Sequence, residues 1–185
     1  MNLEIIVRTY ISKIRPHAQS ELDWFKQQLT LEAAIEKAAL AINSRGKRYH
    51  HQRRLKQGAL QRAKEALLLN SEAIEESNSF DDLFDLINRL VRPIEGIGEL
   101  YVYDTALRIS AKVGLLPQRV YLHAGTRDGA EKMGLDHEAT ALEVKTLPPE
   151  FDRLEPHEVE DLLCIFKDDL EPTDVESMTE RSWCG

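Results

Sequence analysis

Apolar residues recur at intervals of three and four along most of the chain. This spacing places side chains on one face of an α-helix. Leu31, Ile35 and Ile42, for example, fall on one such face. From this pattern we expect helices over residues 3–14, 19–28, 31–43, 52–69, 80–91, 99–113 and 156–167. The β-branched content of 3–14 leaves a strand open as an alternative there. The fold class predicted is all-α.

Six residues mark where predicted helices begin or end. Thr30 and Ser79 stand just before two of them, where a hydroxyl oxygen can accept a hydrogen bond from a free backbone N–H. Pro16 is expected to end the first helix, and Gly114 to end the helix over 99–113. A short extended piece follows over 119–122. Thr126 is then expected to cap a short helix that Gly134 closes.

Length and composition indicate one domain with a tail. The chain has 185 residues, enough for a hydrophobic core without disulfides. We expect a single helical domain over 1–167 and an acidic, partly flexible tail over 168–185. Cys164 and Cys184 show no zinc-ligand spacing, so no metal site is expected. No apolar run reaches a membrane span and no signal peptide is evident, so we expect a cytoplasmic protein without a membrane partner.

The net charge of −8 conceals two opposite regions. Residues 136–185 hold 15 of the 32 acidic side chains and only 4 of the 24 basic ones. The rest of the chain therefore carries a small positive excess. The acidic region may be interpreted in three ways: it keeps the protein soluble, competes with phosphates for basic side chains, or docks on a basic protein partner.

A basic segment is the first candidate binding site. Residues 45–64 contain eight Lys and Arg side chains and no acid. Guanidinium groups bind phosphates with two parallel hydrogen bonds, and Tyr49 could stack on a base. The residues predicted to contact nucleic acid here are Lys47, Arg48, Arg53, Arg54 and Lys56. Two other interpretations stay open, namely a solvated helix start and internal pairing with the acidic region.

The second candidate is a short glycine turn between two helices. Gly96 and Gly98 permit a tight backbone path, and Ile97 between them can anchor the turn in the core. The helix that follows offers free N–H groups and a positive dipole end to a phosphate. Over residues 80–113 this arrangement resembles the helix-hairpin-helix motif of DNA-binding and DNA-repair proteins. The resemblance implies contact with the DNA backbone without base readout, and a possible monovalent cation held by hairpin carbonyls as the sole cofactor.

A wider resemblance extends over residues 80–135. After the second helix come Pro117 and the run Val120 to Arg127. This layout is similar to the all-helical DNA glycosylases that carry the hairpin, which continue with a proline, an extended piece and a catalytic aspartate. In this chain His123 stands near that position, and the nearest acids are Asp104 and Asp128. Because the expected aspartate is not matched, whether the protein is an enzyme stays undecided, with binding favoured over catalysis.

The sequence therefore predicts a nucleic-acid-associated protein. The expected partner is DNA. Its sugar–phosphate backbone is expected to bind to the glycine turn, at Gly96, Ile97 and Gly98, and to the basic segment. One alternative is a glycosylase-like or lyase-like enzyme that acts on nucleic acid, with Asp104, His123 or Asp128 in its site. Another is an interaction module that uses the acidic C-terminal region.

Overall fold

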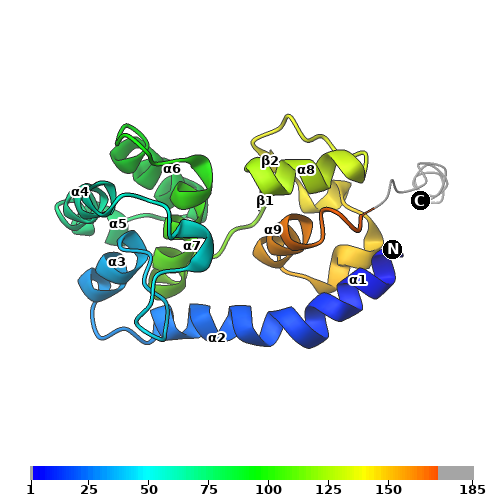
Figure 1. Ribbon diagram of the computed structural model, residues 1–185, viewed down its shortest axis with the longest axis horizontal. Helices are drawn as coiled ribbons and strands as arrows, with labels where there is room; N and C mark the ends of the chain where they lie inside the picture. The colour runs from blue at the N-terminus through cyan, green and yellow to red at the C-terminus, as the bar shows by residue number, and fades with distance from the viewer. Residues whose placement is uncertain (1, 171–185) are drawn as a thin grey trace. The chain divides into compact units, whose positions relative to one another are not determined.

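The computed structural model describes residues 2–170, and these are mostly helical with one two-stranded sheet (Figure 1). The predicted all-α class is confirmed at this level. The contacts group the chain into two compact units, where the sequence predicts one domain over 1–167. Unit 1 comprises Met1–Arg15 and Gln118–Gly185, and unit 2 comprises Pro16–Pro117. Most of the predicted acidic tail, from residue 171 onward, lies outside the described residues.

The N-terminal helix continues past the proline that was expected to end it. α1 (Leu3–Thr9) runs through a π-helical turn (Tyr10–Ile14) into α2 (Arg15–Lys26). The predicted end at Pro16 is therefore wrong. A proline ring normally clashes with the carbonyl four residues earlier and removes one hydrogen bond. Here the π turn shifts the bonding, so that Arg15 N donates to Tyr10 O. The wider turn accommodates the proline at the second position of α2.

Unit 2 holds most of the longer helices. The elements that follow α2 in it are α3 (Leu31–Ala39), a 3-10 turn (His50–Gln52), α4 (Gln57–Leu68), α5 (Ser71–Glu75), α6 (Phe80–Val91) and α7 (Glu99–Val113). The N-caps predicted at Thr30 and Ser79 are confirmed. Thr30 Oγ1 accepts from Ala33 N at 3.2 Å, and Ser79 Oγ accepts from Asp82 N at 3.1 Å. Gly114 ends α7 in the left-handed conformation, at φ +81°.

The helix predicted over 52–69 begins later, at Gln57. The chain before it folds as a tight hairpin over residues 41–49, in which Asn43 N donates to Lys47 O at 2.8 Å and Tyr49 N donates to Ala41 O at 2.9 Å. Ala41 has φ +54°, which stops α3 before the expected end at residue 43. The 3-10 turn and an irregular stretch then lead to α4.

α7 is the central helix of unit 2 and packs against α3 and α6 (Figure 1). The side chains that it buries include Tyr101, Val102, Tyr103, Ala106 and Ile109. The Tyr101 hydroxyl donates to Ala39 O at 2.7 Å, and burial raises the pKa of this tyrosine to about 12. α7 is thus fixed on several sides and can serve as a rigid support.

Unit 1 is built from α1 and the C-terminal half of the chain. Its further elements are β1 (Val120–Tyr121), α8 (Ala124–Lys132), β2 (Ala141–Leu142), 3-10 turns at Val144–Thr146 and Pro149–Arg153, and α9 (Pro156–Ile165). β1 pairs antiparallel with β2, with Val120 opposite Leu142. The extended piece predicted over 119–122 is confirmed in β1. Its partner strand was not predicted, because two residues carry almost no periodicity.

The start of α8 differs from the prediction. His123 is the N-cap residue, and Thr126 is the third residue of the helix rather than its cap. The Thr126 hydroxyl accepts from His123 N at 2.7 Å and donates to His123 O at 2.8 Å. A threonine at this third position therefore reaches back to the cap, as the acidic residue of a capping box does. Gly134 follows the helix at φ +72°, as expected.

A glycine sets the spacing between α8 and α9. A Cβ atom at Gly129 would lie 2.3 Å from Leu163 O, which is backbone and cannot swing aside. Gly129→Ala is expected to lower the free energy of unfolding by about 1–3 kcal/mol, measured by urea denaturation. The matched control is Gly58→Ala, where the nearest atom is a side-chain nitrogen of Arg62 at 3.8 Å. That change should leave the free energy of unfolding unchanged or slightly raised, because Gly58 is the second residue of α4 and an alanine there meets no clash. Equal stability of the two variants would contradict the close packing.

Because His157 is buried, we expect the stability of unit 1 to depend on pH. Burial lowers the pKa of its imidazole below the ordinary 6.5, because the charged form is poorly solvated there. The unfolded chain thus binds a proton more readily than the folded one. The stabilisation that comes from burying neutral His157 is fully present above about pH 6.5 and is lost as the pH falls toward the lowered pKa. Between pH 7.5 and pH 5.5, wild type should lose more unfolding free energy than His157→Gln in urea denaturation. Parallel losses in the two proteins would contradict this.

Candidate nucleic-acid interface

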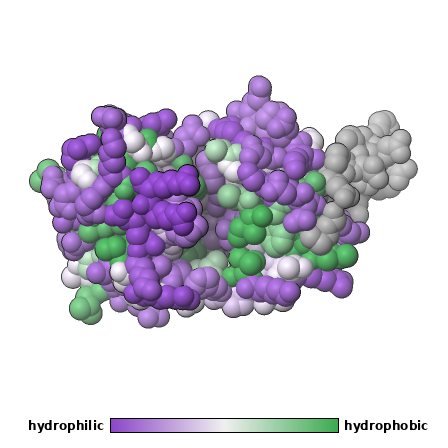
Figure 2. Space-filling model, viewed as in Figure 1, coloured by the Kyte–Doolittle hydropathy of each residue, from purple (hydrophilic) through white to green (hydrophobic). Residues whose placement is uncertain are grey.

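The basic segment lies on the surface of unit 2. Its first part, residues 45–56, is the cyan stretch between α3 and α4 in Figure 1, and residues 57–64 belong to α4. Figure 2 shows mostly hydrophilic side chains over the same part of the unit. The exposed cations of this stretch are Arg45, Lys47, Arg53, Arg54 and Lys56. Four of these were predicted as contacts. Arg45 was not, although it belongs to the same run of charges. These side chains provide five positive charges accessible to a phosphate strand.

Arg48 differs from the other predicted contact residues. It is half-buried, and its guanidinium donates to Leu55 O at 3.1 Å and to Gln57 Oε1. Its backbone also forms an isolated antiparallel bridge with Ile42. The structure therefore places Arg48 in contacts that shape the segment from within. It holds the hairpin against the start of α4 rather than extending into solvent.

A polar network anchors the basic segment to α7. Asp104 Oδ2 accepts hydrogen bonds from Gln52 Nε2 at 2.7 Å and from Arg108 NH2 at 3.1 Å. His51 Nε2 lies 2.7 Å from the same oxygen. Arg108 NH1 donates in turn to Gln52 Oε1 at 2.9 Å. Arg108 and Gln52 are both buried, so these bonds form largely away from water. Asp104 and Arg108 stand four residues apart on α7, a spacing that brings the two side chains together on one face of the helix.

A second set of contacts fixes the hairpin on α2. The Tyr49 hydroxyl donates to Glu21 Oε2 at 2.8 Å, and Ser44 N donates to the same oxygen at 3.2 Å. Burial opposes the charge on Glu21, but hydrogen bonds from Ser44 and Tyr49 outweigh it and lower the carboxyl pKa. The Arg108 guanidinium carbon lies 3.9 Å from the centre of the Tyr49 ring. One face of that ring is thus covered by a cation and cannot stack on a base.

The glycine turn lies exposed between α6 and α7. Gly96 has φ +90°, a left-handed conformation that favours glycine, and Gly98 is the N-cap residue of α7. Ile97 is only 3% exposed, and its N donates to Ile94 O at 3.0 Å. The prediction that Ile97 anchors the turn in the core is confirmed. Both glycines are exposed, so the turn presents its backbone to solvent.

The monovalent cation implied by the family resemblance does not fit this turn well. Arg92 NH1 donates to Ile97 O at 2.9 Å, so a guanidinium already supplies positive charge at that carbonyl. The Gly98 carbonyl accepts from Val102 N at 3.2 Å, within the first turn of α7. A metal ion would have to compete with these donors. The residues present therefore do not favour a cation here.

The first half of α7 links the two candidate binding elements. The glycine turn leads directly into Glu99, and Asp104, which holds the basic segment, follows five residues later. At 1.5 Å of rise per residue these positions are separated by about 8 Å along the helix axis. Because α7 is fixed in the core of unit 2, the turn and the basic segment are held in a constant relation to each other.

The three candidate catalytic residues do not share one compact unit. Asp104 belongs to unit 2, and His123 and Asp128 belong to unit 1. His123 is 2% exposed, with Nε2 2.5 Å from Glu160 Oε1 on α9. Asp128 is exposed and accepts from Lys167 Nζ at 2.9 Å, a hydrogen bond that raises the pKa of that lysine. The observed contacts of each residue hold parts of its own unit together.

Among residues 2–170, no three His, Cys, Asp or Glu side chains gather as a metal site would require. The helices of the same range include none with the length and apolar character needed to cross a bilayer. Protein-family models, curated proteins and solved structures give no match to this chain.

Proposed function

We propose that this protein binds the DNA backbone without sequence preference, through unit 2. One observation supports this most strongly. An exposed glycine turn and a set of exposed cations are both anchored on the first half of one buried helix, α7. A rigid support of this kind lets several weak phosphate contacts act together, because little conformational freedom is lost on binding.

The chemistry of the two elements is complementary. At the turn, the first N–H groups of α7 have no partner inside the helix, and the helix dipole favours an anion there. At the basic segment, the exposed arginines can each hold a phosphate with two hydrogen bonds. Glu95 and Glu99 are exposed near the turn and oppose an anion, so the cations of the segment must supply most of the affinity. Contacts of this type carry no base information.

A salt series on two duplexes tests the proposal. Fluorescence anisotropy is recorded with labelled duplexes of about 20 base pairs and unrelated sequences, between about 50 and 300 mM salt. The two dissociation constants should agree within about twofold. If the five exposed cations each neutralise one phosphate, log K should fall against log salt with a slope of about −4 to −5. Absence of binding at the lowest salt, or a strong preference for one sequence, would contradict the proposal.

The glycine turn has its own test. In Gly96→Ala the new side chain meets no atom within 4 Å, but φ +90° is strained for alanine by about 1–2 kcal/mol. We expect the turn to relax to another conformation and duplex binding to weaken several-fold in the same anisotropy assay. Gly134→Ala is the matched control, because φ there is +72° with equally open space, but in unit 1. If both variants bind alike, the turn is not part of the interface.

A further inference from the structure

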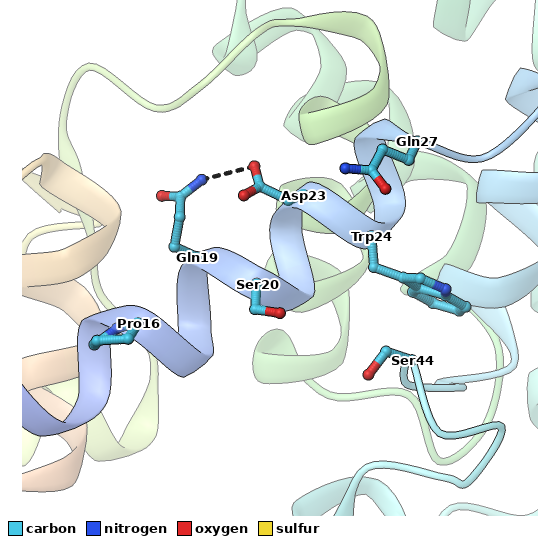
Figure 3. Close-up of a pocket in the computed structure, with 7 residues that line it drawn as sticks. All are labelled: Pro16, Gln19, Ser20, Asp23, Trp24, Gln27 and Ser44. Atoms are coloured by element: carbon cyan, nitrogen blue, oxygen red, sulfur yellow. Dashed lines mark hydrogen bonds between the residues drawn. The ribbon is translucent and has the colours of Figure 1, made fainter.

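A pocket of about 440 Å³ opens along α2, within unit 2 (Figure 3). Six of its lining residues share one face of the helix, at spacings of three and four, and Ser44 comes from the hairpin of the basic segment. The lining consists of Pro16, Gln19, Ser20, Asp23, Trp24, Gln27 and Ser44. Its volume falls in the range of small-molecule sites. Neither the glycine turn nor the exposed cations line it, so the proposed backbone contacts leave it unassigned.

The lining combines one aromatic ring with several hydrogen-bonding groups. Trp24 is half-buried, and its indole packs edge-to-face on Phe25 with ring centres 4.9 Å apart. Asp23 Oδ1 accepts from Gln19 Nε2 at 3.0 Å, a bond that orients the carboxylate beside the pocket (Figure 3). Hydroxyl and amide groups complete the wall. A planar heterocycle with N–H donors on one edge matches this set of groups, by stacking on the indole and donating to the carboxylate.

The pocket adjoins the cations that would hold phosphates. Ser44 is fixed by Glu21, which accepts from its N at 3.2 Å and also from its hydroxyl. Exposed Arg45 is the next residue, with its Cα about 3.8 Å farther along the chain, and Lys47 follows two residues later. A nucleotide whose base entered the pocket would therefore have its phosphates near these two cations.

We propose that this pocket binds an unpaired nucleobase, with guanine preferred, of a strand whose phosphates the basic segment holds. The proposal builds on the backbone binding proposed above. Guanine is the base that presents a ring N–H and an exocyclic amino group side by side, so it can donate two parallel hydrogen bonds to the carboxylate of Asp23. The indole of Trp24 supplies the stacking surface. The protein would then bind single-stranded or locally unpaired DNA more tightly than backbone contacts alone allow.

Single strands that differ at one position test the base subsite. Thymidine 12-mers carry at their centre a guanine, a hypoxanthine, which lacks the exocyclic amino group, or an abasic residue. The phosphates are identical, so backbone contacts are equal in all three. Wild type should bind the guanine strand roughly tenfold or more tightly than the abasic strand, with hypoxanthine between them. Equal affinity for the guanine and abasic strands would overturn the subsite.

Two variants and one spectroscopic signal connect the preference to the pocket. Trp24→Leu should reduce binding of the guanine strand to the abasic level, and Asp23→Asn should remove the difference between guanine and hypoxanthine. Neither change should alter duplex binding. A variant that retained the wild-type preference would show that the substituted residue is not part of the base subsite.

Tryptophan fluorescence reports on the stacking contact directly. In a Trp183→Phe background, Trp24 is the sole remaining tryptophan, and its fluorescence should be quenched by the guanine strand but not by the abasic strand. Unquenched fluorescence would overturn the stacking contact. Loss of duplex binding by wild type itself would instead overturn the proposed function.

Discussion

Replacing Arg53, Arg54 and Lys56 together by alanine is expected to weaken duplex binding roughly tenfold to hundredfold near 0.15 M salt. All three side chains are exposed, so their removal should leave the fold intact. Each phosphate contact that is lost reduces the release of condensed counterions, so the slope of log K against log salt should fall in magnitude by up to about 3. The loss should be equal for unrelated duplex sequences, and the anisotropy assay measures all three quantities.

The control for this variant removes the same charge from unit 1. Lys13, Lys132 and Lys145 are all exposed and belong to unit 1, so their joint replacement by alanine changes the net charge equally. A general electrostatic attraction would weaken binding alike in both triple variants. The proposed interface requires a much smaller effect in the control. If the first variant kept wild-type affinity and slope, residues 53–56 would not be part of the interface.

Arg108→Met is expected to lower the free energy of unfolding by about 2–4 kcal/mol and to weaken DNA binding as well. The Arg108 guanidinium donates to Gln52 and Asp104 and lies over the Tyr49 ring. Its removal leaves a largely buried carboxylate at Asp104 without its full charge partner and loosens the anchor of the basic segment. Urea denaturation gives the first quantity and anisotropy the second.

A double variant separates the lost charge partner from the lost packing. In Asp104→Asn/Arg108→Met both charges are absent, so no uncompensated charge stays behind, and part of the stability should return. DNA binding should stay weak, because the hydrogen bond from Arg108 to Gln52 and its contact with the Tyr49 ring are still missing. A single Arg108→Met variant as stable as wild type would show that the network is not what holds the segment on α7.

Local features of the fold were predictable from the sequence. The caps at Thr30 and Ser79 and the left-handed end at Gly114 depend on residues three or four apart, and the structure confirms them. The glycine turn belongs to the same group, since its φ +90° at Gly96 and its anchor Ile97 follow from adjacent residues. The ion pair between Asp104 and Arg108 is local in the same sense, because four residues make about one helical turn.

Features that depend on distant residues were not predictable. The 3-10 turn before α4 is held by Gln52 and His51, whose side chains contact Asp104 more than fifty positions away. Nothing in the sequence indicates that Glu21 bonds to Ser44 and Tyr49, because these residues come together only in the folded unit. Arg48 was indistinguishable by sequence from its exposed neighbours. The pocket likewise arises where one face of α2 meets the hairpin.

We propose, above all, that unit 2 holds a phosphate backbone through the glycine turn and the basic segment. Titration of the ¹⁵N-labelled full-length protein with a short duplex, followed by amide NMR shifts, tests it most directly. We expect the largest shifts at residues 45–56 and 96–100, with residues 118–170 little affected. Shifts confined to residues 118–170, with those of 96–100 unmoved, would contradict it.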